Sequence, residues 1–163
     1  MSGRKATSAL RDDARSIVES LSLLYGKKNE LLRTLLLSES DKLYYEKSGN
    51  VDRVVAIIRD DERLIDEVDL VDCEIAGLEQ GLSELIGVPP RALYGILADV
   101  PGARDLVALR ARTRDSVEHL LDERSALIQR LQNASSSVRD SINELSRIGR
   151  LKRDENGEMP PLP

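Results

Sequence analysis

Two side chains of this sequence have the chemistry of a nucleophile or a metal ligand, and each is the only one of its type. His119 is the sole histidine, and it follows Glu118. Cys73 is the sole cysteine, and no histidine lies near it in the sequence to activate its thiol. A zinc site in a protein needs several such ligands that converge in space. We therefore interpret Cys73 as an inert thiol and do not expect His119 to be catalytic or to bind a metal.

Carboxylates are abundant, above all between Asp60 and Asp69. A di-iron helical bundle requires a glutamate followed three residues later by a histidine on two helices, and no glutamate of this chain has that spacing. The acidic residues are better explained as a solvated helix face. The sequence also has no glycine-rich phosphate loop and no nucleophile motif. We expect no enzymatic activity and no bound cofactor.

The composition restricts the remaining classes of function. The net charge is -5, and aromatic residues make up 2% of the chain, with no Phe and no Trp. Neither property suits nucleic-acid binding, which uses basic surfaces and aromatic stacking. No apolar run is long enough to span a membrane, and the first residues, MSGRKATSALRDD, lack the apolar region of a signal peptide. Together with a lone cysteine, these features predict a soluble cytoplasmic protein with no membrane insertion.

The elements that must position these residues are long helices, and the clearest lies between residues 51 and 87. Apolar residues recur in it at alternating steps of three and four, which is the rhythm of a coiled coil. Such a stripe needs partner helices, and at 1.5 Å per residue this rod would be about 50 Å long. The stripe consists of Val54, Ile57, Asp61, Leu64, Val68, Val71, Ile75, Leu78, Leu82 and Leu85.

A second rod, residues 8–48, precedes it and has Lys28 and Gly26 within its pattern. The string LLRTLLL (31–37) is apolar on more than one stripe, so either a third helix covers the surplus or part of it remains exposed as a binding patch. Ser48, Gly49 and Asn50 then form a short connection, in which Gly49 supplies a left-handed stop and Asn50 caps the next helix. A connection this short makes its two helices antiparallel neighbours.

Three prolines interrupt the pattern after Gly87, and they enclose one short helix at 90–98. A third rod follows at 103–148, and its second half is flanked by serines of mediocre helix propensity. The sequence thus predicts an all-α fold, an elongated antiparallel bundle of three long helices with a short connector helix. The bundle domain would span 7–148, between a flexible N-terminus (1–6) and a flexible C-terminal tail (149–163).

Two details of the central rod concern its packing. Asp61 interrupts the apolar stripe, and a polar residue at such a position commonly fixes the register of the helices. We expect that Lys28 of the first rod can pair with it. Gly77 and Gly81 are four residues apart on one face, where they would let another backbone approach.

Three stretches of the chain resemble FlgN-type flagellar export chaperones. They are the leucine-rich first helix SIVESLSLLYGKKNELLRTLLLSESDKLYYEKSGN, the close of the second helix LEQGLSELIG followed by prolines, and ERSALIQRLQNASSSVRDSINELSRI in the third. The resemblance implies a cytoplasmic chaperone that binds the C-terminal amphipathic helices of hook-filament junction proteins and keeps them unassembled before secretion. Lys152 stands near the place of a tyrosine through which such proteins dock on the export gate, so docking of this tail on the export apparatus stays open.

In that family the client is bound by the C-terminal part of the chaperone. An apolar stripe on a weakly helical segment suits a helix-in-groove mode of recognition, although the same stripe could instead complete the bundle. A chaperone awaiting its client should be a monomer or a weak homodimer. The alternative function is a structural coiled-coil adaptor or self-assembling rod. The expected partner-binding residues are Leu131, Val138, Ile142, Leu145, Ile148 and Leu151.

Overall fold

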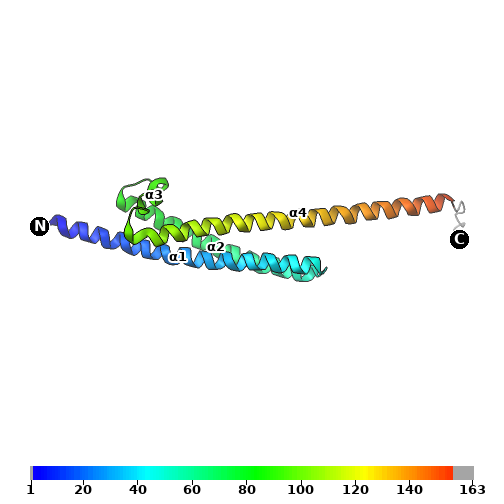
Figure 1. Ribbon diagram of the computed structural model, residues 1–163, viewed down its shortest axis with the longest axis horizontal. Helices are drawn as coiled ribbons and strands as arrows, with labels where there is room; N and C mark the ends of the chain where they lie inside the picture. Colours follow the sequence, from blue (N-terminus) through cyan, green and yellow to red (C-terminus); the bar gives the residue numbers. More distant parts are fainter. Residues whose placement is uncertain (1, 156–163) are drawn as a thin grey trace, which may run out of the picture. The chain divides into compact units, whose positions relative to one another are not determined.

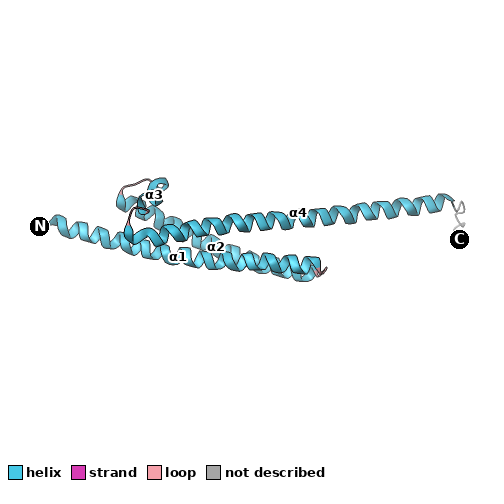
Figure 2. Ribbon diagram, viewed as in Figure 1, coloured by secondary structure: helices cyan, strands magenta, loops and turns pink. Residues whose placement is uncertain are grey.

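The computed structural model describes residues 2–155, and it describes side chains for residues 11–147. This part of the chain is entirely helical apart from short turns, and it contains no strand (Figures 1 and 2). The elements are α1 (Ser2–Lys47), α2 (Val51–Ile86), the 3-10 turn η1 (Pro90–Ala92), α3 (Leu93–Leu97), the 3-10 turn η2 (Pro101–Ala103) and α4 (Arg104–Glu155). The all-helical class predicted from the sequence is therefore confirmed.

The chain divides into two compact units, residues 1–123 and residues 124–163. We call them the first unit and the second unit. The first contains α1, α2, the connector and the beginning of α4, and the second contains the rest of α4. The boundary between the two units falls within α4.

The turn between α1 and α2 has the chemistry that the sequence predicts. Gly49 adopts a φ of 73°, a left-handed conformation that side chains with a Cβ rarely adopt. The side chain of Asn50 accepts a hydrogen bond from the amide of Arg53 at 3.1 Å, which caps α2. Gly87, with a φ of 70°, ends the same helix, and Pro90 opens the connector.

The start of α1 and the end of α4 both extend further than the sequence predicted. Helix α1 already begins at Ser2, although residues 1–6 were expected to be flexible and the helix to start near residue 8. Helix α4 continues to Glu155, so residues 149–155 of the expected tail are helical. Adding a residue to an existing helix costs little compared with starting one, and Gly149 disfavours the helix by only about 1 kcal/mol relative to Ala.

The apolar stripe of α2 is the inner face of the first unit. Each of its ten predicted members is buried or half-buried, including Asp61. One core cluster joins Leu21 and Tyr25 of α1 to Val71 and Leu82 of α2, and α4 adds Leu106. A second cluster, nearer the turn, contains Leu32, Leu35 and Leu120. Burial of each such leucine stabilises the fold by about 2 kcal/mol.

The excess leucines of residues 31–37 are mostly covered. Leu32 and Leu35 are buried, Leu31 and Leu36 are half-buried, and only Leu37 is exposed. The beginning of α4 contributes to this cover, because Leu120 packs in the same cluster. Of the two predicted alternatives, cover by a third helix accounts for most of the string, while Leu37 remains 62% exposed.

The glycines of α2 do not mark a close approach of two backbones. A Cβ added to Gly77 or to Gly81 would meet no atom within 4 Å outside the local helix. The expectation that these glycines let another backbone approach is wrong. They are four residues apart on one face, but the helices that pack on α2 contact its apolar stripe instead.

Candidate functional site

The two side chains that the sequence singles out for their chemistry lie on different helices. Cys73 on α2 and His119 on α4 are both exposed. No group of three or more histidine, cysteine, aspartate or glutamate side chains in the described part of the chain could hold a metal ion. Nor does any helix among the described residues have the length and apolarity that crossing a membrane requires.

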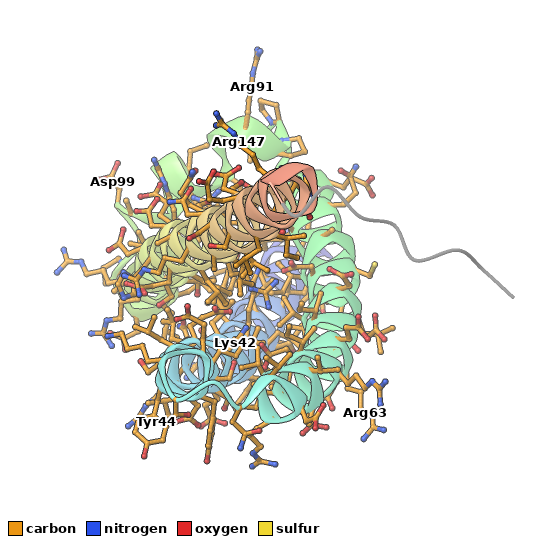
Figure 3. All side chains as sticks on the ribbon, turned by 90° about the vertical axis from the view of Figure 1, so that its right-hand side faces the viewer. Lys42, Tyr44, Arg63, Arg91, Asp99 and Arg147 are labelled. Carbon is orange, nitrogen blue, oxygen red and sulfur yellow. The ribbon has the colours of Figure 1, made fainter. Side chains whose placement is uncertain are left out.

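A buried ionic cluster lies between α1 and α2 near their turn. Nζ of Lys42 donates hydrogen bonds to Oε1 of Glu39 at 2.6 Å and to Oδ2 of Asp61 at 2.7 Å. The hydroxyl of Ser38 donates to the other oxygen of Asp61 at 2.7 Å. Figure 3 shows Lys42 pointing inward from α1, whereas Tyr44 and Arg63 point away from the hairpin. All three charged side chains are almost fully buried, so this cluster is a structural element of the hairpin.

The register of the hairpin explains why Asp61 pairs with Lys42 and not with Lys28. Lys28 lies 22 residues before Asn50 and its actual partner, Asp72, lies 22 residues after it. Asp61 is only 11 residues beyond Asn50, so it is displaced by about 16 Å along the helix from the level of Lys28. The predicted Lys28–Asp61 pair is therefore wrong, although the prediction of a polar contact within the stripe is right.

A second polar cluster joins α3 of the connector to α1 and α2. The hydroxyl groups of Tyr25 and Tyr94 both donate to Oε1 of Glu79, at 2.8 and 2.5 Å. The guanidinium of Arg110 lies 4.0 Å from the centre of the Tyr94 ring. Burial raises the pKa of Tyr94 above its usual value, and the hydrogen bond to Glu79 raises it further. Burial also raises the pKa of Tyr25. Both phenols therefore keep their protons, which they donate to Glu79, to a higher pH than an ordinary tyrosine does.

The expected partner-binding residues lie on the second unit, on the part of α4 that follows Glu123. Leu131, Val138, Ile142 and Leu145 have exposed fractions of 40, 60, 57 and 68%. The sequence pattern of the stripe predicted Ile142 and Leu145 correctly as neighbours on one helix face, since they are three residues apart on a continuous helix. The side chains of Ile148 and Leu151 lie outside the described residues.

Ile128 belongs to the same face and was missed by the sequence reasoning. Its side chain is 55% exposed, and it lies three residues before Leu131. The sequence pattern does contain Ile128, because a step of three residues back from Leu131, instead of four, leads to it. The exposed apolar positions then fall at alternating steps of three and four, interrupted only by Ser135. We call this set, Ile128, Leu131, Ser135, Val138, Ile142 and Leu145, the α4 stripe.

A shallow depression follows the beginning of the α4 stripe. It is lined by Ile128, Leu131, Gln132, Ser135, Ser136 and Arg139, all within the second unit. Two small residues, Ser135 and Ser136, are part of its lining. The arrangement can accept a side chain from another helix.

Comparisons with known proteins do not assign the chain to a family. No family model, no curated protein and no solved structure matches it. The resemblance to the FlgN-type chaperones therefore depends on the three stretches of sequence quoted above. Function has to be argued from the exposed side chains.

A further groove lies within the first unit, and no sequence pattern predicted it. It has a volume of about 550 Å³ and lies beside the connector. Val18 of α1 and Leu82 and Ile86 of α2 line it, together with Ile96 and Val100. Ile96, one of these lining residues, is 41% exposed. Leu97 and Ala103, which also line the groove, are buried in the core cluster that contains Leu82.

Proposed function

We propose that this protein is a cytoplasmic flagellar type III export chaperone. It binds the C-terminal amphipathic helices of hook-filament junction proteins through the α4 stripe and keeps these clients unassembled before secretion. The proposal takes the three long helices as an elongated antiparallel bundle and includes no enzymatic activity. The observation that carries it is the exposure of the apolar side chains of the α4 stripe, from Ile128 to Leu145.

The exposure supports a binding role because apolar residues on a soluble helix are ordinarily covered. In the first unit, the stripes of α1 and α2 are covered by each other and by the beginning of α4. In the second unit, every described residue from Gln129 to Arg147 is exposed, including four apolar members of the α4 stripe. An amphipathic helix of a client would bury these side chains in the helix-in-groove mode.

Calorimetry with the isolated C-terminal helix of a junction protein tests the proposal. We expect a 1:1 complex and a negative change in heat capacity, because apolar surface is buried on binding. The double variant Ile142→Asp/Leu145→Asp should abolish the heat of binding. Its circular dichroism spectrum should stay close to that of the wild type, because the helices of the first unit are unaffected. A matched control, Asn133→Asp/Ser137→Asp, places the same charges outside the stripe and should bind normally. Absence of heat and of co-elution with the wild-type protein would refute the proposal.

A structural adaptor or self-assembling rod is the second candidate. Exposed apolar side chains on the first unit favour it, since Leu23, Leu70 and Leu37 are 77, 67 and 62% exposed. Sedimentation at micromolar concentration separates the two candidates. A rod that assembles through these leucines forms a stable homo-oligomer, whereas the proposed chaperone is a monomer or a weak homodimer.

A further inference from the structure

The depression on α4 has the composition of two consecutive holes of a coiled coil. In such packing, each side chain of one helix inserts between four residues of the facing helix, at positions i, i+3, i+4 and i+7. Ile128, Leu131, Gln132 and Ser135 have this spacing, and they form the first hole. Gln132, Ser135, Ser136 and Arg139 have the same spacing, and they form the second. The six residues that line the depression are the members of these two sets.

The charge on this face has one sign. At 3.6 residues per turn, Arg139 is the only charged residue between positions 125 and 147 that lies on the same side of α4 as the α4 stripe. Asp140, Glu144 and Arg147 lie on the opposite side of the helix. Arg139 makes no ion pair with any described residue, and its side chain is exposed. A partner that covers the stripe would therefore meet apolar side chains and one unpaired positive charge.

From these holes and this charge, we infer that the α4 stripe selects an amphipathic helix with an apolar side chain and, three or four residues away, an acidic residue. The apolar side chain occupies the first hole, beside Ile128 and Leu131, and the carboxylate lies at the polar second hole, where it pairs with Arg139. The inference rests on the proposed function and specifies the class of helix that the same surface binds. A lysine in place of the acidic residue is disfavoured by repulsion from Arg139.

Two synthetic helical peptides of about three heptads test the inference with the full-length protein. Both peptides carry leucine at the apolar positions. They differ only at the position that faces Arg139, which is glutamate in one peptide and lysine in the other. Fluorescence anisotropy at low salt should show the glutamate peptide binding at least about threefold more tightly, as expected for one exposed ion pair gained and one repulsion avoided. Arg139→Glu should reverse this preference. Arg147→Glu, the same change of charge on the opposite side of α4, should leave it intact.

A second pair of variants tests the holes. Ser135→Glu places a charge at a residue that both holes share and should weaken both peptides about tenfold or more. Ser137→Glu makes the same substitution two residues away, on the other side of the helix, and should have little effect. Circular dichroism of both variants checks that α4 keeps its helical content. Equal losses in the two variants would overturn the assignment of the holes.

The outcomes separate the inference from the proposed function. If a junction-protein helix binds but the two synthetic peptides bind equally, the charge selection is wrong and the chaperone proposal stands. If the synthetic peptides bind as expected but no junction-protein helix does, the surface is correctly described and the client is wrong. Failure of all peptides overturns both. If the protein also sediments as a dimer that Ser135→Glu dissociates, a second copy of the chain covers the stripe.

Discussion

Lys42 of α1 and Asp61 of α2 form an ion pair of 2.7 Å between Nζ and Oδ2, with only 4% of either side chain exposed. Glu39 accepts a second bond from the same ammonium group at 2.6 Å. Asp61 occupies a position in the apolar stripe of α2, where the periodicity favours a leucine or an isoleucine. A buried ion pair of this kind need not stabilise a fold more than apolar residues would. Removing only one partner is strongly destabilising, because the other charge is then buried without compensation.

Replacing Lys42 by Met should therefore destabilise the first unit strongly. The change removes the cation that lies between Glu39 and Asp61 and leaves two buried carboxylates close together. We expect the free energy of unfolding to fall by about 3–5 kcal/mol. Urea denaturation followed by circular dichroism measures this loss. A loss below about 1 kcal/mol would show that the cluster is solvated.

The ion pair between Lys28 and Asp72 provides the matched comparison. Its atoms are 2.5 Å apart, but the side chain of Asp72 is 44% exposed, and water screens the interaction. Asp72→Asn should consequently reduce the free energy of unfolding by less than about 1 kcal/mol. The same urea titration applies. If this variant lost as much stability as Lys42→Met, burial would not be the property that distinguishes the two pairs.

The tyrosines predict how stability depends on pH in the alkaline range. The pKa values of Tyr25 and Tyr94 are raised in the folded state, above a usual value of 10.0. The folded protein therefore holds these protons more tightly than the unfolded chain does. Their contribution to stability is complete below about pH 10 and is lost as the pH rises toward the folded-state pKa values. Denaturation at a series of alkaline pH values should show this decline.

A Tyr25→Phe/Tyr94→Phe variant should be less stable at neutral pH and should lose less stability than the wild type above about pH 10. The two phenylalanines keep the ring contacts, whose centroids lie 6.4 Å apart, and remove only the hydroxyl groups. Parallel alkaline curves for the two proteins would contradict the assignment of the effect to these phenols.

Gly77→Ala should stabilise the protein. Gly77 lies inside α2 in an ordinary helical conformation, and an added Cβ meets no atom within 4 Å. Alanine restricts the unfolded chain and favours the helix, so the free energy of unfolding should rise by about 0.5–1 kcal/mol. Thermal unfolding measures the gain. Gly87→Ala is the contrasting variant, because a φ of 70° strains alanine, and it should lower stability instead.

The periodicity of the sequence predicted much of the fold. Steps of three and four residues located the buried face of α2 correctly from Val54 to Leu85, and the residues Gly49, Asn50 and Gly87 located its ends. These features could be predicted because periodicity and capping depend on residues within one or two turns of each other. The pairing of Lys28 was predicted wrongly because it depends on the register of two helices across the turn.

By itself, the sequence determined that the described chain is helical, which side of each helix is apolar and where the first hairpin turns. Only the tertiary structure decided which apolar side chains are covered. Leu120 and Leu131 belong to the same pattern along α4, yet Leu120 packs with Leu32 and Leu35, whereas Leu131 is 40% exposed. The physical reason is that an apolar stripe is a local property of one helix, while its burial requires another helix to reach the same position.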